Sequence, residues 1–550
     1  MTEILPLRDK QIEQLAFYIR EKKCLDLSDP GTGKTPPCCV MAWYAHAREN
    51  KQTIWTMPKS LRKKNKQELH RFTEFKDHQV EVMHTDRANL TKDWTGPVIE
   101  STRRVATWEL QDGRYTHDIR EDATNQYTKF YYEDAKEKLY RKLGPGKDVT
   151  FEAGLPSDGM LVVPKVGPDG EPIKEWVDVP ERFKDLIKDA AERGVRVFIS
   201  TFAFMKTHWK RMIEAAPDID LFLVDEIHMG YGGNDSKQTE SFYWLNKHCS
   251  RFVGMTGTLI NGRLDTAFPA IHVIEPRYYG SYEGFIYEHC AASDDYGRVV
   301  TWKNEAKLAQ IIERHSIRRT FEEVYGEEDV VFFLEHIDVD EEVREAYDEF
   351  HDNAMLELDD GSIIEGGMPG VDLIRARQLL SHPETMLKLK NEWTPKDEWL
   401  ITELSSGRKT LIFAALQPEQ ERILRLCKSL GLQAELINAN VSGKDRDRID
   451  ARAQAGELDV IIGSGPTVAV GYNWEMFDAV VFASIDYMDT NVLQAYRRAS
   501  RGGRTTQLRV VFLRYKNTVE KKIFKIVEKK SELANRVDST RRVLTFDAYE

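Results

Sequence analysis

The sequence predicts an α/β fold in which two tandem lobes are each built on a parallel β-sheet. Two series of short apolar runs, separated by helix-like segments, carry this prediction. They lie at 24–27, 54–57, 195–200, 221–224 and 252–255, and at 409–415, 434–438, 460–463, 479–483 and 508–513. Continuous apolar runs are typical of strands that are buried on both faces of a sheet. The 550 residues, at roughly 150 per domain, leave room for both lobes and for additional subdomains.

Three segments, 11–20, 38–47 and 519–536, are predicted to be helices. In the first, apolar residues recur at helical spacing, at Ile12, Leu15, Ala16 and Ile19. The second follows a glycine-rich loop, and the third closes the chain as one long helix. A strand, a loop, a helix and a further strand in this order are the usual start of a parallel α/β domain.

The remaining stretches divide the chain into domains. Turn signals and alternating aromatic and charged residues at 87–192 predict an α+β subdomain inserted in the first lobe. Within it, Asp169-Gly170 between two apolar runs predicts a hairpin. The stretch 268–395 is richly charged and helix-like, which predicts a helical linker or protrusion region. The predicted domains are a first lobe at 1–267, the linker region at 268–395, and a second lobe with the closing helix at 396–550.

The composition excludes several classes of protein. A net charge of −12 argues against a protein that binds nucleic acid over most of its surface, although it is compatible with a local basic track. None of the six cysteines forms a CxxC pair, so we expect reduced thiols and no zinc site. The N-terminus has no apolar core and no run of eighteen apolar residues occurs, so we expect neither a signal peptide nor a membrane span. These features predict a cytoplasmic chain.

The segment 29–35 has the composition of a phosphate-binding loop. Its glycines let the backbone approach an anion, and the following helix points its N-terminus at the same place. Lys34 supplies a cation for the β- and γ-phosphates, and the Thr35 hydroxyl supplies a magnesium ligand. Ser28 stands where the common pattern has a first glycine. The predicted nucleotide-binding residues of the loop are Asp29, Pro30, Gly31, Thr32, Gly33, Lys34 and Thr35.

An acidic pair directly follows the apolar run 221–224. We predict that Asp225 holds Mg²⁺ through water and that Glu226 orients and deprotonates the attacking water. A strand that merely ends in two solvated carboxylates is the alternative for the pair alone. Because the phosphate-binding loop lies upstream, the catalytic interpretation is favoured, and the two segments together predict hydrolysis of a nucleoside triphosphate.

The segment 494–504 is dense in arginine. Arg498 and Arg501 are three residues apart and therefore share one face of a helix. Such cations stabilise the negative charge that develops in phosphoryl transfer. Both residues are therefore predicted to be catalytic and to point into a cleft between the lobes. A basic surface helix that binds a phosphate backbone is the alternative.

In their order along the chain, these and further segments resemble the Swi/Snf-type branch of helicase superfamily two, in a compact bacterial or bacteriophage form. The similar segments are Leu7-Arg8-Asp9-Lys10-Gln11, Pro58-Lys59-Ser60-Leu61, Ser200-Thr201-Phe202, Asp225-Glu226-Ile227-His228, Thr256-Gly257-Thr258, Ile317-Arg318-Arg319-Thr320, Arg377-Gln378, Gly471-Tyr472-Asn473-Trp474 and Gln494 to Gly503. Three features depart from the family pattern: the segment 464–469, Arg504 in place of a glutamine, and the insertion at 87–192.

The resemblance implies two RecA-like lobes that hold ATP and Mg²⁺ between them. It adds Arg8, Gln11, Gly471 and Gln494 to the ATP-binding residues, with Gln11 as the reader of adenine. It also implies contacts with nucleic acid at Lys59, Ser60, Thr201, Thr256, Thr258 and Asn473. The basic residues near 59–66, and Arg446 with Arg448 in the second lobe, are further candidates for phosphate contacts; solvated helix faces are the alternative.

Three functions fit these predictions. The leading one is an ATP-dependent translocase on DNA, with a duplex favoured and RNA not excluded. A second is a strand-separating or branch-migration helicase, for which the insertion is the visible candidate for a wedge. A third is an ATP-gated binding or inhibitor module with an acidic surface. The insertion is a possible site for a protein partner, although its aromatic residues also suit a small core of its own. We expect a monomer.

Overall fold

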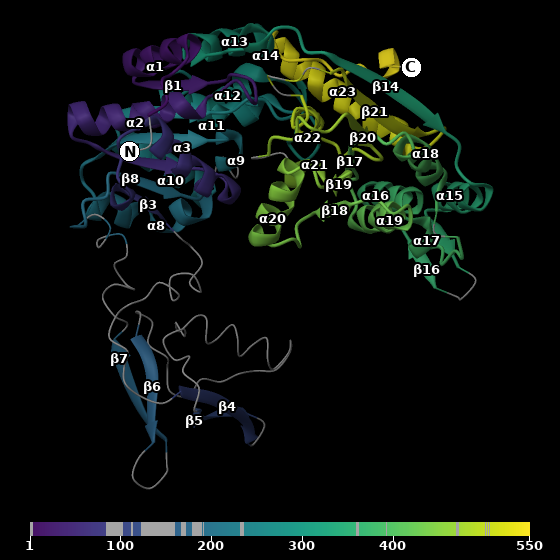
Figure 1. Ribbon diagram of the computed structural model, residues 1–550, viewed down its shortest axis with the longest axis horizontal. Coiled ribbons are helices and arrows are strands. Elements are labelled where there is room, and N and C mark those ends of the chain that lie inside the picture. Colours follow the sequence, from purple (N-terminus) through teal and green to yellow (C-terminus); the bar gives the residue numbers. More distant parts are fainter. Residues whose placement is uncertain are drawn as a thin grey trace.

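The computed structural model describes residues 4–83, 103–111, 114–122, 160–166, 172–178, 187, 190, 192–231, 236–358, 362–391, 393–468, 472–500, 502, 504 and 506–549. Figure 1 shows two α/β lobes side by side, with the N-terminal elements in one lobe and the C-terminal elements largely in the other. Each lobe contains one large sheet in which every described pair of neighbouring strands is parallel. The predicted fold class is therefore confirmed.

The sheet of lobe one contains the five strands that the first series of apolar runs predicts. Among the described residues its order is β13 (Ser316–Ile317), β1 (Lys23–Asp26), β10 (Arg251–Met255), β9 (Ile219–Asp225), β2 (Gln52–Thr56), β8 (Val197–Ser200) and β3 (Val80–Val82). Alternate residues of β9 enter different apolar clusters, with Phe222 on one face of the sheet and Leu223 on the other. Both faces are covered, which explains why these strands read as continuous apolar runs.

Helices cover both faces of this sheet. Residues of α1 (Asp9–Glu21), α2 (Thr35–Glu49) and α3 (Arg62–Phe72) pack on one face. Residues of α8 (Phe202–Ala215), α10 (Lys237–His248), α11 (Phe268–Ile274) and α13 (Glu305–Arg314) pack on the other. The shorter elements of this lobe are η1 (Lys59–Leu61), η2 (Asp77–Gln79), α9 (Ile227–Gly230), η4 (Leu264–Ala267), α12 (Tyr282–His289), α14 (Phe321–Tyr325) and the hairpin of β11 (Cys290–Ser293) and β12 (Val299–Trp302).

The first helix forms as predicted, but its buried residues are not those of the apolar repeat. Ile12 is 52% exposed, whereas Gln14 and Tyr18 are buried. Gln14 Nε2 donates to Asp26 Oδ2 at 2.9 Å, and the Tyr18 hydroxyl donates to the same carboxylate oxygen. The helix thus packs through polar side chains because the strand beneath it ends in a buried carboxylate that needs hydrogen bonds.

The sheet of lobe two contains all five strands of the second series and one more. Among the described residues the order is β14 (Val330–Ile337), β21 (Leu508–Tyr515), β20 (Ala479–Phe482), β17 (Thr410–Phe413), β19 (Val460–Gly463) and β18 (Ala434–Ile437). Its faces are covered by α20 (Gly443–Gln454), α22 (Asp489–Tyr496) and α23 (Val519–Val537), and by α18 (Pro395–Leu404) and α19 (Gln417–Ser429). The four-residue helix α21 (Gly465–Val468) precedes α22.

The stretch 268–395 differs from the helical linker that the sequence suggests. Its strand β13 joins the sheet of lobe one, and its strand β14 joins the sheet of lobe two. Both are edge strands, and β14 interrupts its apolar run with Glu335 and His336, so neither has the pattern of a central strand. Beyond β14 the stretch forms α15 (Glu341–Asn353), α16 (Pro369–Ser381), α17 (Pro383–Met386) and the hairpin of β15 (Met355–Glu357) and β16 (Ile363–Glu365).

The long closing helix is confirmed as α23, and it connects the two lobes. Phe524 and Val527, near its start, pack in the apolar core of lobe two, whereas Ala534 and Val537, at its end, pack in the core of lobe one. The tail that follows ends in η5 (Phe546–Tyr549), whose Phe546 returns to the core of lobe two. One helix therefore fixes the lobes relative to each other in this structure.

Two antiparallel hairpins represent the predicted insertion among the described residues. They pair β4 (Arg103–Gln111) with β5 (Arg114–Asp122), and β6 (Met160–Val166) with β7 (Pro172–Asp178), and Figure 1 draws both below lobe one. The second pairing agrees with the predicted hairpin, although its turn at Asp169-Gly170 lies outside the described residues. No helix in the described part of the chain is long and apolar enough to cross a membrane.

Candidate functional site

The predicted phosphate-binding loop connects β1 to α2, as its composition requires. Gly31 and Gly33 have φ angles of 91° and 92°, a region that L-residues with side chains rarely adopt. At Gly33 the surroundings are also closed, because an added Cβ would lie 2.6 Å from Gln11 Nε2 and 2.7 Å from Arg8 Nη2. Both glycines are therefore required by the backbone, independently of any ligand.

Gln11 and Arg8 contact this loop directly. The Gln11 amide donates from Nε2 to the Gly33 carbonyl at 3.1 Å and accepts from the Arg8 backbone N–H at 3.0 Å. Arg8 Nη2 donates to the Thr32 carbonyl at 3.5 Å, and the Thr32 hydroxyl donates to the Asp29 carbonyl at 2.8 Å. The predicted adenine-reading segment thus begins one helix whose first turn also supports the loop.

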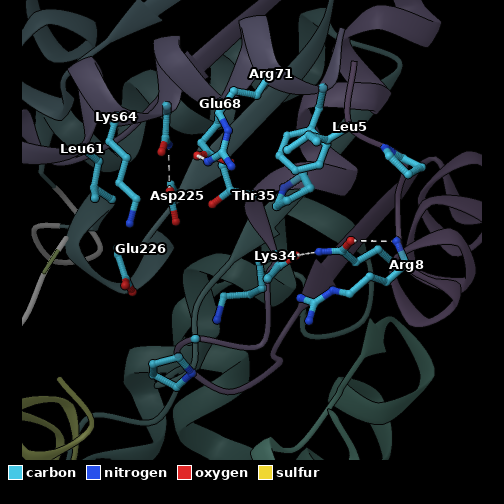
Figure 2. Close-up of a pocket in the computed structure, with 18 of the residues that line it drawn as sticks. Leu5, Arg8, Lys34, Thr35, Leu61, Lys64, Glu68, Arg71, Asp225 and Glu226 are labelled. Carbon is cyan, nitrogen blue, oxygen red and sulfur yellow. Dashed lines mark hydrogen bonds and ion pairs between the residues drawn. The ribbon is translucent and has the colours of Figure 1, made fainter. Parts of the chain in front are cut away.

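A pocket of about 600 Å³ opens along the loop. Figure 2 shows Asp225 and Glu226 at one end of this pocket and Leu5 and Arg71 at the other. The lining includes ten residues that the sequence predicts for the nucleotide site: Arg8, Gln11, Pro30, Gly31, Gly33, Lys34, Thr35, Asp225, Glu226 and Arg498. Nine of them belong to lobe one, and Arg498 belongs to lobe two. Residues of both lobes therefore line one pocket.

Lys34 lies at the end of the loop, as the N-cap residue of α2. Its ammonium donates to the Ser28 carbonyl at 2.6 Å and to the Asp29 carbonyl at 3.1 Å. Thr35 is the first residue of α2 and lines the pocket. Pro36 and Pro37 follow it and have no backbone N–H, so the helix start offers mainly the Thr35 hydroxyl and the positive end of the helix dipole. This arrangement provides a cation and a helix N-terminus for the phosphates of a nucleotide.

Asp225 ends β9 and is buried, and Glu226, which follows it, is half-buried. Burial, followed by the charge of Glu226, raises the pKa of Asp225 to about 6, and a hydrogen bond from Asn65 Nδ2 at 3.1 Å opposes this rise. Burial also raises the pKa of Glu226, against the charges of Lys34 and Arg498. A carboxylate whose pKa is raised towards neutrality is suited to accept a proton from water.

The oxygen donors at this end of the pocket suit Mg²⁺. Mg²⁺ is usually bound by one or two protein oxygens and completes its shell with water and substrate phosphates. Thr35 and Asp225 line the same pocket and offer a hydroxyl and a carboxylate. The described residues contain no cluster of three or more His, Cys, Asp or Glu side chains that would hold a metal by itself. The site therefore fits a metal that arrives with a nucleotide.

Thr256 and Thr258, which we expected to contact nucleic acid, are instead buried behind Glu226. The Thr256 hydroxyl lies 3.5 Å from Glu226 Oε2 and 2.7 Å from His228 Nδ1. The Thr258 hydroxyl lies 3.3 Å from the same nitrogen and accepts from Gln494 Nε2 at 3.3 Å. A continuous chain of polar contacts thus runs from the acidic pair to lobe two. Gln494 belongs to this chain and is not part of the pocket lining.

His228 lies in the middle of this chain. Burial, followed by the charge of Arg541, lowers the pKa of His228 to about 4. The imidazole is therefore neutral near pH 7, with one nitrogen free of a proton. A separate hydrogen bond also bridges the two lobes, since the Thr490 hydroxyl donates to Asn261 Oδ1 at 3.1 Å.

The arginines of lobe two divide between two positions. Arg498 lines the pocket with Lys34 and Glu226. Its neighbour Arg497, which the sequence interpretation passed over, lies on the other side of the loop, with Nη1 3.2 Å from Asp29 Oδ1. Arg318 Nη2 lies 3.4 Å from the same oxygen. Burial alone would raise the pKa of Asp29, but these two arginines outweigh it and lower that pKa.

Two predicted residues of the site, Gly471 and Arg501, lie outside the described residues. Their placement stays a prediction. The sequence contained no signal that would have separated Arg497 from Arg498, because both lie in one arginine-rich segment and only the packing of the two lobes gives them different surroundings.

The predicted contacts with nucleic acid fall into two groups. Lys59, Ser60 and Asn473 are exposed. Arg446 is half-buried and its guanidinium donates to the Asn438 carbonyl at 2.6 Å and to the Val441 carbonyl at 3.0 Å. Thr201 is buried as the N-cap of α8, where it accepts from the Phe204 N–H at 3.1 Å. The geometry therefore leaves Thr201 and Arg446 with structural roles as well.

One basic residue of lobe one, Lys63, faces α20 of lobe two. Lys63 Nζ lies 2.9 Å from Asp447 Oδ2, and both side chains are largely exposed. This pair joins α3 to α20 across the space between the lobes. The two predicted phosphate-binding segments, 59–66 and 446–448, therefore approach each other in the folded chain.

Comparison with known proteins gives similarity to helicases and chromatin remodellers. Residues 395–506 match the family model described as Helicase conserved C-terminal domain. The chain is 20% identical over 342 residues, 58% of its length, to the CHD3-type chromatin-remodeling factor PICKLE of Arabidopsis thaliana. It is 22% identical over 357 residues, 60% of its length, to the Chromodomain-helicase-DNA-binding protein 3 homolog of Caenorhabditis elegans. It is 26% identical over 141 residues, 26% of its length, to Chromodomain-helicase-DNA-binding protein 1-like of Mus musculus.

These matches cover only part of the relatives, between 16% and 24% of their own lengths. A solved structure, the Sulfolobus solfataricus SWI2/SNF2 ATPase core in complex with dsDNA, aligns over 100% of this chain and 97% of its own, with 17% identity and a TM-score of 0.35. A TM-score this low does not establish a shared arrangement of the two lobes. By sequence, the chain is similar to helicase C-terminal domains in lobe two and, over more than half of its length, to remodellers of the CHD type.

Proposed function

We propose that this chain is an ATP-driven motor of the Swi/Snf branch of helicase superfamily two, and that it moves along duplex DNA. One observation carries the proposal: Arg498 of lobe two lines the same pocket as Lys34, Thr35, Asp225 and Glu226 of lobe one. A nucleotide in that pocket would contact both lobes, so its hydrolysis would change how strongly the lobes are held together.

The hydrolytic step uses residues on both sides of the pocket. Lys34 and the start of α2 would bind the phosphates, and Glu226 would orient and deprotonate the attacking water. Arg498 would stabilise the negative charge that develops on the γ-phosphate. Mg²⁺ bound through Thr35 and Asp225 would neutralise the β- and γ-phosphate oxygens.

Coupling to movement would run through contacts between the lobes. The polar chain from Glu226 to Gln494 connects the water-activating carboxylate to lobe two. Closure on ATP and release after hydrolysis would then alternate the grip of each lobe on DNA. The grip would be made mainly to phosphates, through residues such as Lys59 and Lys63, and would be tolerant of sequence.

Two observations support DNA as the track. The basic segment of lobe one lies opposite α20 of lobe two, so both lobes present candidate contacts to the same space. Two of the similar proteins are named as a chromatin-remodeling factor and as a chromodomain-helicase-DNA-binding protein. Remodelling of DNA or of protein–DNA complexes is the activity that these relatives suggest.

The decisive experiment compares ATP hydrolysis without nucleic acid and with duplex DNA, single-stranded DNA or RNA, each at two salt concentrations. We expect duplex DNA to give the largest stimulation, and the stimulation to weaken at the higher salt because phosphate contacts release counterions. Glu226→Gln should abolish turnover while DNA binding remains. If no nucleic acid stimulates hydrolysis, the motor is refuted and the ATP-gated binding module takes its place.

A second assay separates translocation from strand separation. A translocase displaces a third strand bound to a duplex but leaves a simple fork intact. Robust unwinding of a forked substrate would replace the translocase by the strand-separating helicase, and failure on both substrates would leave hydrolysis without movement.

A further inference from the structure

A buried amide on α3 connects the basic track to the acidic pair. Asn65 is 1% exposed, and its Nδ2 donates to Asp225 Oδ2 at 3.1 Å and lies 3.3 Å from Met57 Sδ. Met57 directly follows β2 and precedes η1. A side chain of α3 thus contacts the residue that ends β9 and the residue that follows β2. These two strands are neighbours in the sheet.

The helix that carries this amide has two functional faces. Lys63 is exposed and pairs with Asp447 of lobe two, so this face belongs to the candidate DNA track. Leu61, Lys64, Asn65, Glu68, Arg71 and Phe72 line the nucleotide pocket. Their spacing of three and four residues defines one side of a helix, and Figure 2 shows Lys64, Glu68 and Arg71 along one wall of the pocket. A displacement of α3 by DNA would therefore also move the wall of the pocket.

An asparagine is suited to this place for a chemical reason. Its amide is neutral and donates a hydrogen bond, so it orients a carboxylate without neutralising it as a lysine would. Partners that orient a metal ligand from outside the coordination sphere affect metal affinity although they never touch the metal. Asp225 is the carboxylate that suits Mg²⁺, so the amide would set the direction in which its free oxygen points.

We propose that Asn65 is a positioning residue that couples contact between DNA and α3 to the orientation of the magnesium carboxylate Asp225. The inference rests on the proposed function, because it concerns how DNA stimulates that site. In this account DNA moves α3, α3 carries the amide, and the amide turns the carboxylate of Asp225 into the direction that binds the metal with the nucleotide.

The test replaces the donor without changing the size of the side chain. In Asn65→Leu we expect the Mg²⁺ concentration that half-saturates binding of a fluorescent ADP analogue to rise about tenfold in the presence of duplex DNA. Stimulation of ATP hydrolysis by DNA should fall with it. Asn65→Ser, which keeps a shorter donor, should lie between Asn65→Leu and the unmodified chain, and it provides a second variant if the leucine form does not fold.

Two control variants come from the same helix. Gln67→Leu removes an amide from the exposed surface of α3, and Leu69→Ala damages the buried face without touching Asp225. Both should keep the Mg²⁺ dependence and the DNA stimulation of the unmodified chain, although Leu69→Ala should lose thermal stability. The proposal is overturned if Asn65→Leu keeps both properties, or if Leu69→Ala changes them equally. If the unmodified chain itself shows no DNA stimulation, the proposed function fails instead.

Discussion

The two lobes have similar architectures but contribute unequally to the pocket. Lobe one provides the phosphate-binding loop, the acidic pair and the wall of α3, whereas lobe two provides Arg498 to the lining and Arg497 to the back of the loop. Lobe one therefore contributes most of the lining of the proposed nucleotide site. Lobe two supplies cations whose position depends on how the lobes are held, so it is suited to control hydrolysis rather than binding. Four predictions test this division.

Loss of Arg498 should have the largest effect. We expect Arg498→Ala to lower kcat for ATP hydrolysis by about 10³-fold or more, as for cations that stabilise the transferring phosphoryl group. The KM for ATP should change little, since lobe one keeps its loop. Kinetics of both parameters check this. Arg504→Ala is the control, because that guanidinium donates to the Phe477 carbonyl at 2.7 Å instead of lining the pocket. Equal losses in the two variants would contradict the assignment.

The attachment of lobe two to the loop should depend on Asp29. Asp29→Asn leaves Arg497 and Arg318 facing each other without their carboxylate, so the free energy of unfolding should fall by about 3 kcal/mol. Denaturation by urea measures this. Glu13→Gln, which removes an exposed partner of Arg319, should cost less than about 1 kcal/mol. A loss of similar size in both variants would show that the buried ion pairs of Asp29 contribute no more to the free energy of unfolding than an exposed pair does.

The neutral imidazole between the lobes should make stability depend on pH. The pKa of His228 is about 4 in the folded chain, against about 6.5 in an unfolded chain. As the pH falls below 6.5, His228 therefore becomes protonated in the unfolded chain, whereas in the folded chain it stays neutral until about pH 4. The free energy of unfolding decreases across that window. Between pH 7 and pH 5 the unmodified chain should lose about 2 kcal/mol relative to His228→Gln. A difference that stays constant over this range, measured by denaturation at each pH, would contradict the prediction.

The exposed pair between Lys63 and Asp447 should have the smallest effect. Asp447→Asn removes a carboxylate that faces the basic track, so duplex DNA should bind more tightly, by less than about 1 kcal/mol. Fluorescence anisotropy at low salt measures the change. Glu457→Gln, at the far end of α20, removes the same charge away from the track and should leave the affinity unchanged. An equal increase in both variants would indicate only an effect of net charge.

Local patterns predicted most of the fold and the lobe-one half of the site. Apolar runs identified ten strands because strands covered on both faces need apolar residues at every position. The edge strands β13 and β14 were not predicted by this criterion, because an edge strand tolerates polar residues on its open side. The glycines of the loop and the acidic pair were predicted because both lie within short segments whose chemistry is complete in itself.

The side-chain partners of the site could not be predicted in the same way. The burial of Gln14 and Tyr18 on α1 could not be read from its apolar spacing, because both hydrogen-bond to a carboxylate on another element. Thr256 and Thr258 were assigned to nucleic acid, yet they lie buried between Glu226 and Gln494. The contact of Thr258 with Gln494 joins residues 236 positions apart, whereas Asp26 lies only 8 and 12 positions from Tyr18 and Gln14. In both cases the partner is set by how two elements pack, which a local pattern does not record.

The sequence by itself determined that this chain folds as two parallel α/β lobes, and it predicted a phosphate site from 29–35 and 225–226. Those features depend on periodicity and on residues within one turn of each other, which a linear pattern records. Only the tertiary structure decided which arginine lines the pocket, which one holds Asp29, and that Asn65 reaches Asp225. These choices depend on the direction of side chains across two packed lobes, where Arg497 and Arg498, adjacent residues just beyond the end of α22, have different surroundings.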